Sequence, residues 1–479
     1  MLTNIKGQEL TDKMKQFPLL LLLCMLTAFA DAFAQDEVSG VYVGGHIRRQ
    51  RPGTITTLRN SGFTYVILFN VHVDTDGTLK TDGETICKDG EYVFQNTQPY
   101  YQQDIKNLKT APTGISRIDI CIGGWGNDSY TNIKNLIASG GTGKSSILYR
   151  NFKALKEAVP EIDAVNNDDE QTYDVSSAAK FHIMMYDLGY KTTLAPYTYK
   201  SFWTSLCSQI RSSRPKAVDR VMIQCYDGGA GNVNSVGTWE FAGVTNRHAG
   251  LLNYSNDWSI EKNTAQFEKW RDDGVAKGGF VWVYNDESWN LNGWASAINR
   301  TYGPPRTVPE DRVVVRCYSE KNYGGYCIPL TEGIYTQADL ALHGLAANDL
   351  SSVEILDDNY RVKLYTSANC TGTFMTRSVS GKNLATAFDN KVCSIKVEVK
   401  PGGTGINGTT ADDDILLTAE GGNIIVENAE GEQLCIYDMA GKLVSQDRIL
   451  AASQAVSLSS LPRGNYIVRV ADKAIRLLR

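Results

Sequence analysis

The sequence has no run of lysine or arginine, and its formal net charge is only −5 over 479 residues. Binding to nucleic acid or to an anionic membrane surface normally uses a concentrated basic patch, so we expect neither as a partner. No C-x-x-C pair occurs, which argues against a zinc ribbon or a thioredoxin-like redox site. The five histidines, at positions 46, 72, 182, 248 and 343, show no metal-ligand spacing.

The phosphate-binding loop pattern is also incomplete. Residues 140–145 read Gly-Gly-Thr-Gly-Lys-Ser, but the pattern G-x-x-x-x-G-K-[ST] needs a glycine where the chain has Ala138. We therefore expect a flexible loop here and not a nucleotide site. The composition is that of a globular protein, with 42% hydrophobic residues, and its length suggests about three domains.

The N-terminal segment has the features of an export signal. Lysines at 13 and 15 precede an apolar run over residues 19–30, and a small-x-small signal peptidase site follows at 32–34. The run is shorter than the ~20 residues that a membrane span needs. The sequence thus predicts a signal peptide over residues 1–34, with translation starting at Met1 or Met14, and an exported mature protein.

Nine cysteines follow the predicted cleavage site, and four of them, at 317, 327, 370 and 393, fall within one short segment. Export permits disulfides, so we expect these four to pair. Cys317 with Cys327 and Cys370 with Cys393 is one of the three pairings that four cysteines allow.

From residue 38 to about 302, short apolar runs alternate with helical segments, as in βα units around a parallel sheet. Eight candidate strands are expected at 41–44, 65–71, 117–123, 162–168, 192–196, 220–226, 250–254 and 280–284. Eight such units predict an α/β fold, a (β/α)₈ TIM barrel over residues 35–305. We expect no metal ion in the barrel.

The pattern changes after Gly303-Pro304-Pro305. Residues 312–398 have short alternating runs in two similar halves, which predicts an all-β domain. Residues 401–414 are polar and Gly-rich and are expected to form a linker. Residues 415–479 alternate again and predict a small C-terminal β-sandwich.

The segment over residues 162–170 ends the fourth candidate strand with the sequence Asn-Asn-Asp-Asp-Glu. Alternate side chains of a strand share a face, so Asn166, Asp168 and Glu170 are expected to point the same way, about 6.6 Å apart per step. In a (β/α)₈ barrel this end of a strand faces the catalytic pocket. Two neighbouring carboxyls raise the pKa of one of them, which can then act as an acid. The alternative is an acidic loop without a role.

This segment resembles the D-x-x-D-x-D-x-E signature of glycoside hydrolase family 18, the chitinases and endo-β-N-acetylglucosaminidases, with Asp163, Asp168 and Glu170 on its first Asp, third Asp and Glu. Four other candidate strands carry similar motifs. Residues 121–125 resemble S-x-G-G-W, 194–196 resemble L-A-P, 224–227 resemble Q-x-Y-[ND], and 278–282 resemble G-G-v-m-x-W. The order and spacing of these motifs are those of the family across the whole barrel.

The resemblance implies hydrolysis with retention of configuration, in which the 2-acetamido group of the substrate acts as the nucleophile. Glu170 would protonate the leaving oxygen, Asp168 would hold the acetamido N–H, and Tyr226 would donate to the acetamido carbonyl. The implied substrate-binding residues are Asn166, Gln224, Asp227, Trp282 and Trp125, with Trp282 as the apolar floor under the sugar. Gln224 or Asp227 would position Tyr226.

One departure from the family concerns Asn166, which stands where the second Asp is usual. An amide can hydrogen-bond Asp168 but cannot exchange a proton with it, so activity is expected to be reduced. The chain between residues 254 and 280 is too short for the extra domain of processive chitinases. We therefore expect a secreted endo-β-N-acetylglucosaminidase that cleaves the di-N-acetylchitobiose core of N-glycans. Two alternatives stay open: a chitinase on soluble chito-oligomers and a non-catalytic glycan-binding protein.

Residues 318–325 and 365–372 resemble the paired Greek-key motifs of the βγ-crystallin fold. Residues 347–352 and 389–394 resemble that family's calcium signature, [ND]-[ND]-x-x-[ST]-S, although an alanine and a cysteine replace two ligand residues. Calcium requires oxygen ligands. The candidates are Asn348, Ser351, Asp389 and Asn390. We expect at most one weak calcium site, or a purely structural domain, and no required cofactor.

Residues 436–444 and 461–467 resemble the C-terminal sorting domain of type IX secretion, which is an address and not a membrane anchor. An ordinary accessory sandwich is the alternative. The expected partners are glycans or glycoproteins that contain N-acetylglucosamine and the secretion machinery. We expect a secreted or cell-surface monomer without a membrane span.

Overall fold

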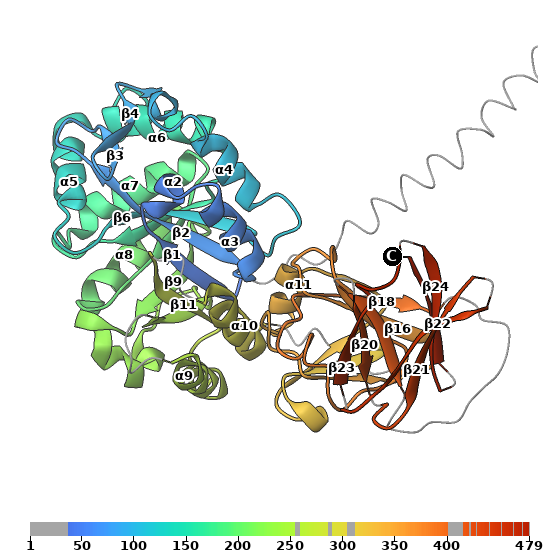
Figure 1. The fold of residues 1–479 in the computed structure, drawn as a ribbon. Helices are drawn as coiled ribbons and strands as arrows, with labels where there is room; N and C mark the ends of the chain where they lie inside the picture. Colours follow the sequence, from blue (N-terminus) through green and yellow to red (C-terminus); the bar gives the residue numbers. More distant parts are fainter. Residues whose placement is uncertain are drawn as a thin grey trace, which may run out of the picture. The chain divides into compact units, whose positions relative to one another are not determined.

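The computed structural model describes residues 37–253, 259–285, 290–303, 312–400 and 415–478, the last range without 421–422, 428, 440, 452, 463 and 472. The predicted signal peptide and the predicted linker lie outside the described residues. The chain runs in order through a barrel, a β-domain and a C-terminal domain (Figure 1), and each has its own hydrophobic core.

Eight parallel strands form the closed sheet of the barrel. They are β1 (Ser39–Val43), β2 (Tyr65–Val73), β6 (Arg117–Gly123), β7 (Ala164–Asp168), β8 (Lys191–Leu194), β9 (Val218–Gln224), β10 (Arg247–Leu252) and β11 (Gly278–Tyr284). Their order is β1-β11-β10-β9-β8-β7-β6-β2, and β1 also pairs with β2, which closes the sheet. The predicted TIM barrel is therefore confirmed. Three short antiparallel strands, β3 (Leu79–Thr81), β4 (Glu84–Lys88) and β5 (Glu91–Tyr92), extend from β2.

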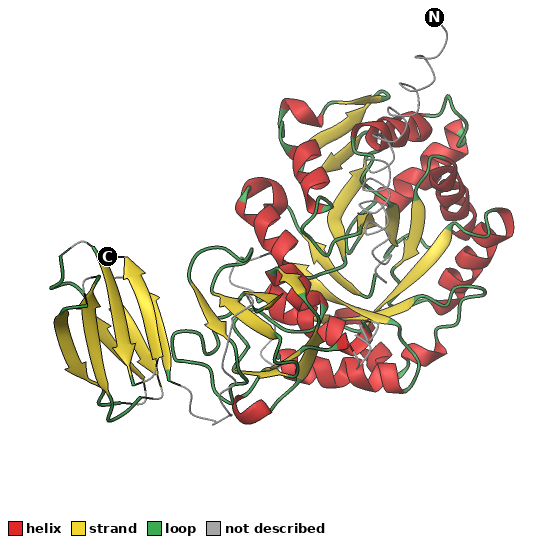
Figure 2. Ribbon diagram, turned by 90° about the vertical axis from the view of Figure 1, so that its right-hand side faces the viewer, coloured by secondary structure: helices red, strands yellow, loops and turns green. Residues whose placement is uncertain are grey.

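Helices surround this sheet (Figure 2). They are α2 (His46–Arg49), α3 (Gly53–Ser61), η1 (Phe94–Asn96), α4 (Tyr101–Leu108), α5 (Ser129–Gly140), α6 (Ile147–Ala158), α7 (Val175–Asp187), α8 (Lys200–Ser213), η2 (Asp227–Asn234), η3 (Val236–Thr238), α9 (Ile260–Asp272) and α10 (Leu291–Tyr302). Helix α6 illustrates why they form, because Ser146 caps its first turn by accepting a hydrogen bond from the backbone N–H of Tyr149. Its apolar stripe, which includes Phe152 and Leu155, is buried against the barrel.

The β-domain contains β12 (Val315–Tyr318), η5 (Lys321–Tyr323), β13 (Cys327–Leu330), β14 (Gly333–Tyr335), α11 (Gln337–Leu342), β15 (Ser352–Ile355), β16 (Tyr360–Tyr365), β17 (Phe374–Arg377) and β18 (Ser394–Val399). Its two antiparallel sheets have the orders β13-β12-β15 and β14-β18-β16-β17. Strand β14 of the first half thus pairs with β18 of the second, as expected of a Greek-key, βγ-crystallin-like domain. The sequence did not predict α11, which begins with a reciprocal capping box between Thr336 and Asp339.

The C-terminal domain contains β19 (Leu416–Glu420), β20 (Asn423–Glu427), β21 (Gln433–Asp438), β22 (Leu443–Arg448), β23 (Ser453–Ser457), β24 (Asn465–Val470) and β25 (Lys473–Leu478). They form two sheets, β19-β20-β23 and β22-β21-β24-β25, with antiparallel pairing. In β24 the side chains of Tyr466, Val468 and Val470 are buried while the intervening residues are exposed. This period of two is the alternation that predicted the sandwich.

The expected disulfides are absent from the described residues, and this expectation was wrong. In the antiparallel pair of β12 and β13, Cys317 lies opposite Ile328, whereas Cys327 lies opposite Tyr318. Successive side chains of a strand point to opposite faces, so Cys317 is buried and Cys327 is exposed. The thiol of Cys370 contacts the backbone carbonyl of Ile395, and that of Cys393 contacts the amide oxygen of Asn348.

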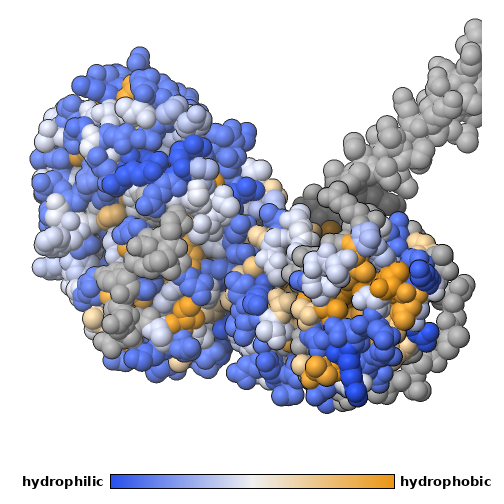
Figure 3. All heavy atoms as spheres, in the orientation of Figure 1, coloured by the Kyte–Doolittle hydropathy of each residue, from blue (hydrophilic) through white to orange (hydrophobic). Residues whose placement is uncertain are grey.

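The surface of the barrel is mostly hydrophilic on the face that Figure 3 shows, whereas larger apolar areas gather over the two β-domains. The large apolar side chains exposed on the C-terminal domain are Met439, Leu443, Val444, Leu450 and Ile467. Within the described part of the chain, no helix is both long and apolar enough to cross a membrane.

A buried ionic network lies near the amino ends of the barrel strands. Arg117 of β6 donates to Asp119 over 2.7 Å and to Asp219 of β9 over 2.8 Å. The hydroxyl of Thr193 donates to the other oxygen of Asp119 over 2.6 Å. Asp119 is 0% exposed, so its charge depends on these partners instead of on water. The network supports the end of the barrel that TIM-barrel proteins use for stability.

Replacing Arg117 with methionine would keep an apolar stem and leave the Asp119 carboxylate without its cation. Breaking a buried pair in this way costs about 3–5 kcal/mol of unfolding free energy. The control is Asp187→Asn, which breaks the exposed pair with Arg214 and should change stability by about 0–1 kcal/mol. Urea denaturation followed by tryptophan fluorescence reports on the barrel, because all eight tryptophans precede residue 295. Equal losses in the two variants would contradict this interpretation.

Candidate active site

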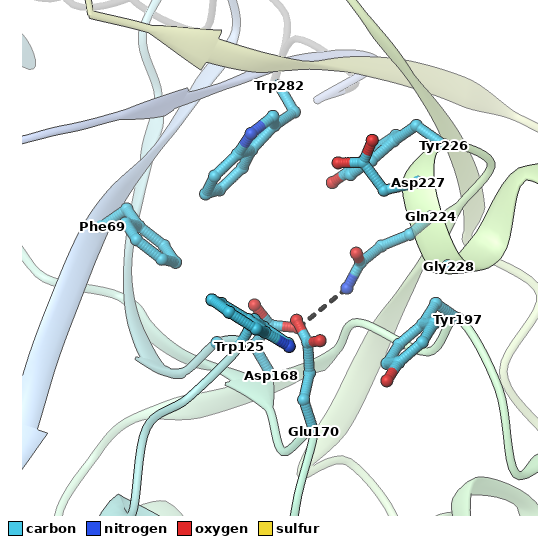
Figure 4. Close-up of a pocket in the computed structure, with 11 residues that line it drawn as sticks. Phe69, Trp125, Asp168, Glu170, Tyr197, Gln224, Tyr226, Asp227, Gly228 and Trp282 are labelled. Atoms are coloured by element: carbon cyan, nitrogen blue, oxygen red, sulfur yellow. Dashed lines mark hydrogen bonds between the residues drawn. The ribbon is translucent and has the colours of Figure 1, made fainter.

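A cavity of about 630 Å³ opens at the carboxyl ends of the barrel strands (Figure 4). It is lined by Phe69, Gly124, Trp125, Asp168, Glu170, Tyr197, Gln224, Tyr226, Asp227, Gly228 and Trp282. These residues lie in, or directly follow, β2, β6, β7, β8, β9 and β11. Parallel closure of the sheet therefore brings together side chains that are far apart in the sequence, at the end of the barrel where such proteins bind ligands.

Seven of the eight residues predicted for a site in the barrel line this one cavity. They are Glu170, Asp168, Tyr226, Gln224, Asp227, Trp282 and Trp125. The eighth, Asn166, is fully buried below it. Its amide oxygen accepts a hydrogen bond from the Tyr42 hydroxyl over 3.2 Å, and its amide nitrogen faces the sulfur of Met222 over 3.6 Å. Its hydrogen-bonding groups are thus directed to these two residues and not to Asp168, which an amide at this position could also have bonded.

Four lining residues were not predicted as site residues from the sequence: two glycines, Gly124 and Gly228, and two aromatic residues, Phe69 and Tyr197. Of these four, the two aromatic residues contribute side chains to the wall. Phe69 lies within β2, and Tyr197 follows the Leu-Ala-Pro segment directly after β8. A signal existed in both cases, because each is an aromatic residue near the carboxyl end of a barrel strand. Neither belongs to a motif of the resemblance, and the sequence alone did not distinguish them from the many other tyrosines and phenylalanines.

Strand β7 and the turn after it are held by polar side chains that point away from the cavity. The amide of Asn167 contacts the Nε2 of buried His182 over 2.9 Å, and its oxygen accepts from the backbone N–H of Asp169. The Asp169 carboxylate then accepts backbone N–H groups of Gln171, Thr172 and Tyr173 over 3.1, 2.8 and 2.9 Å. These bonds fix the loop that carries Glu170.

Close approach of β6 and β7 depends on Gly123. Its φ is +109°, a region that residues with side chains seldom adopt. A Cβ atom there would lie 2.1 Å from the carbonyl oxygen of Asp168. The neighbouring Gly124 donates its N–H to the same oxygen over 2.7 Å. The two glycines of the Cys121–Trp125 segment therefore allow β6 to approach β7 closely and fix the position of the Asp168 backbone.

The Asp168 carboxyl is 4% exposed and is held by Gln224. The Gln224 amide nitrogen donates to it over 2.8 Å, and donates to the carbonyl of Ala195 over 2.9 Å (Figure 4). Burial raises the pKa of Asp168 well above its usual range, and the nearby Glu170 charge raises it further. The hydrogen bond from Gln224 acts in the opposite direction, because it stabilises the ionised form.

Glu170 is half-buried and faces the open part of the cavity. Burial raises its pKa to about 6, and the charges of Asp169 and Asp227 add to this effect. A hydrogen bond from the Tyr197 hydroxyl opposes it. A carboxyl with a pKa near 6 exists in both protonation states around neutral pH, which is what general acid–base chemistry requires.

Aromatic rings form the remaining wall. Trp282 and Tyr226 are nearly parallel, with ring centroids 6.4 Å apart, and Phe69 meets the Trp282 ring edge-on at 4.7 Å. Trp125 stands at the rim and is 91% exposed. A cavity with apolar rings and a few converging polar groups suits a ligand with both apolar and hydrogen-bonding faces. Among the described residues, no three metal-ligating side chains of His, Cys, Asp or Glu gather in one place.

The four candidate calcium ligands lie in two paired loops of the β-domain. Ser351 donates to the amide oxygen of Asn390 over 3.0 Å, and Asn348 accepts from the Cys393 thiol. The ammonium of Lys321 lies 3.0 Å from the Asp389 carboxylate. The protonated lysine forms an ion pair with Asp389 in this arrangement. Calcium binding by these loops stays a prediction.

Comparison with known proteins identifies the C-terminal domain. Residues 418–478 match the family described as secretion system C-terminal sorting domain. No curated protein matches the chain. The sorting domain indicates a secreted or cell-surface protein and implies interaction with the secretion machinery.

Solved structures similar to this chain are βγ-crystallin domains. One from Flavobacterium johnsoniae is 33% identical, with 20% of this chain and 99% of that chain covered and a TM-score of 0.18. A double-mutant domain from Clostridium beijerinckii is 27% identical, with 18% and 94% covered and a TM-score of 0.17. The N-terminal domain of protein S is 26% identical, with 19% and 99% covered and a TM-score of 0.18.

Proposed function

We propose that the barrel is a retaining endo-β-N-acetylglucosaminidase that hydrolyses the β-1,4 bond of di-N-acetylchitobiose in N-glycans. The observation that carries this proposal is the meeting of Asp168, Glu170 and Tyr226 at one cavity lined by aromatic rings. The apolar faces of a sugar would stack on Trp282, and its hydroxyl and acetamido groups would bond to the polar residues. The resemblance of the strand motifs to glycoside hydrolase family 18 supports the same reading.

In the first step, protonated Glu170 gives its proton to the glycosidic oxygen, and the bond from that oxygen to the anomeric carbon breaks. The acetamido carbonyl oxygen of the same sugar attacks the anomeric carbon and forms an oxazolinium ion. Asp168 accepts the acetamido N–H and stabilises the positive charge, while the Tyr226 hydroxyl donates to the acetamido oxygen. Burial makes these electrostatic interactions stronger than they would be in water.

In the second step, water attacks the anomeric carbon from the side that the leaving group vacated, and the bond from this carbon to the acetamido oxygen breaks. The Glu170 carboxylate takes a proton from this water, so the residue returns to its starting state. Two displacements at one carbon restore its configuration. The scheme differs from retaining enzymes in which a second carboxylate is the nucleophile, because Asp168 is 4% exposed in the cavity wall and already bonded to Gln224.

A glycan-binding protein without catalysis is the second candidate. It is favoured by Asn166, whose side chain is directed to Tyr42 and Met222, so that it offers Asp168 no proton. If the protein is an enzyme, the alternative to N-glycans is a substrate of soluble chito-oligomers, and the protein would then be a chitinase. Incubating the protein with a high-mannose glycopeptide and with chito-oligomers, followed by mass spectrometry of the products, separates the three.

Replacing Glu170 with glutamine keeps its shape but removes the transferable proton. General acid–base catalysis contributes about 10²–10⁴-fold, so kcat should fall by that factor while the Kd for uncleaved glycan changes little. Glu157→Gln on the exposed side of α6 is the matched control and should leave kcat unchanged. A Glu170→Gln variant with more than about a tenth of the original kcat would refute the assignment.

The pH dependence of kcat/KM should fall on its alkaline side with a pKa near 6. Glu170 must be protonated to act as the acid, and its protonated fraction decreases as pH rises through this value. Because Asp168 and Glu170 interact, the apparent pKa of the alkaline side of the profile is a property of the two carboxyls together. Initial rates across neutral pH provide the measurement, and a rate that stays constant well above pH 7 would be inconsistent with this acid.

The stereochemistry of the first product tests the nucleophile. Attack by the acetamido group predicts that a β-linked substrate releases the β-anomer before mutarotation. Proton NMR during the first minutes of the reaction distinguishes the two anomers by their anomeric coupling. Initial release of the α-anomer would show inversion and exclude the oxazolinium route.

A further inference from the structure

A cluster of three tyrosines lies on the Glu170 side of the cavity. Tyr173 belongs to the same loop as Glu170, and its backbone N–H is bonded to Asp169. Its ring packs against that of Tyr199 with centroids 4.5 Å apart, and against that of Phe202 at 5.2 Å. Both the backbone and the ring of Tyr173 are therefore fixed.

The backbone of this cluster is unusual. Tyr173 and Tyr199 have φ values of +48° and +47°, in the left-handed region that residues other than glycine, asparagine and aspartate seldom adopt. Such conformations persist only where the surrounding structure imposes them, and they concentrate at functional sites. Two of them meet here ring to ring, near the Glu170 carboxyl that lines the cavity.

Tyr197 links this cluster to the acid. Its hydroxyl accepts a hydrogen bond from the Tyr173 hydroxyl over 3.4 Å and lies near enough to Glu170 to lower the pKa of that carboxyl. Figure 4 shows its ring on the Glu170 side of the cavity, beside Gly228. A Cβ atom at Gly228 would lie 2.8 Å from this ring, so the absence of a side chain there gives Tyr197 its place.

We propose that Tyr197 is a positioning residue for Glu170, and that Tyr173 holds the Tyr197 hydroxyl in the orientation that this requires. The inference rests on the proposed function, in which Glu170 transfers the proton. A chain of two hydroxyls strengthens the final hydrogen bond, because each donor polarises the next. The two hydroxyls together fix the Glu170 carboxyl and stabilise its ionised form. They therefore set the pH above which Glu170 no longer carries the proton.

Several titratable groups face Glu170, and the test must separate Tyr197 from them. They are Asp168 and Asp169 of β7 and its following loop, Tyr226 and Asp227 after β9, Cys121 of β6, and Tyr173 and Tyr197. The hydrogen bond from Tyr197 lowers the pKa of Glu170. Removing the Tyr197 hydroxyl alone, with all the other groups in place, should therefore raise the pKa of Glu170.

Three tyrosine-to-phenylalanine changes form a matched set, because each removes one hydroxyl and keeps the ring. Tyr197→Phe should move the alkaline limb of kcat to higher pH by about one pH unit, with a fall in kcat and little change in KM. Tyr173→Phe should produce a smaller shift in the same direction. Tyr199→Phe, whose side chain is 62% exposed, is the control and should leave the profile unchanged.

The pKa of Glu170 is also to be measured directly, by infrared difference titration of the carboxyl band against Glu170→Gln. This measurement needs no turnover. If the protein hydrolyses no substrate, the proposed function is refuted, but the pKa of Glu170 in the variants still tests the positioning role of Tyr197. An unchanged Glu170 pKa in Tyr197→Phe would overturn the proposal, as would an equal shift in Tyr199→Phe. A raised KM without a shift would also overturn it, because Tyr197 would then contact the sugar. An unchanged Tyr173→Phe profile would overturn the role of Tyr173.

Discussion

Burial of Asp168 beside Glu170 puts two carboxyl groups where water cannot stabilise both charges. The Gln224 amide donates to Asp168, and the Tyr197 hydroxyl lowers the pKa of Glu170, so each carboxyl has a polar group that favours its ionised form. The deeper carboxyl is enclosed by protein, whereas the outer one meets the open cavity. In the proposed mechanism this difference in environment gives the two groups different tasks, as in enzymes that separate the pKa values of paired acids.

The two ends of the barrel differ in what they contain: one holds an ionic network and the other holds the cavity of the candidate site. At the amino ends of the strands, Arg117 donates to Asp119 and Asp219 in an ionic network. At the carboxyl ends, polar side chains line a cavity together with Trp282 and Trp125. The same parallel closure produces both, because it aligns all strand beginnings at one end and all strand endings at the other.

The position of Asn166 shows how a substitution within a motif is accommodated. The asparagine bonds to Tyr42 and faces Met222, and Gln224 from β9 provides the hydrogen bond that Asp168 receives. A neutral amide donor stabilises a carboxylate without exchanging a proton with it. The site therefore keeps Asp168 in place, and in the proposed mechanism the proton comes from Glu170.

Much of the fold followed from the sequence by itself. Eight apolar runs separated by helical stripes determined the barrel, and alternating positions such as 466, 468 and 470 determined the sandwich, because burial of one face imposes a period on the chain. Spacing along β7 also predicted that Asp168 and Glu170 share a cavity. Only the tertiary structure decided that Asn166 bonds Tyr42, that Tyr197 reaches Glu170, and that Cys317 and Cys327 face apart. Such pairings depend on which strands are neighbours, and apolar periodicity within one strand shows only which of its faces is buried.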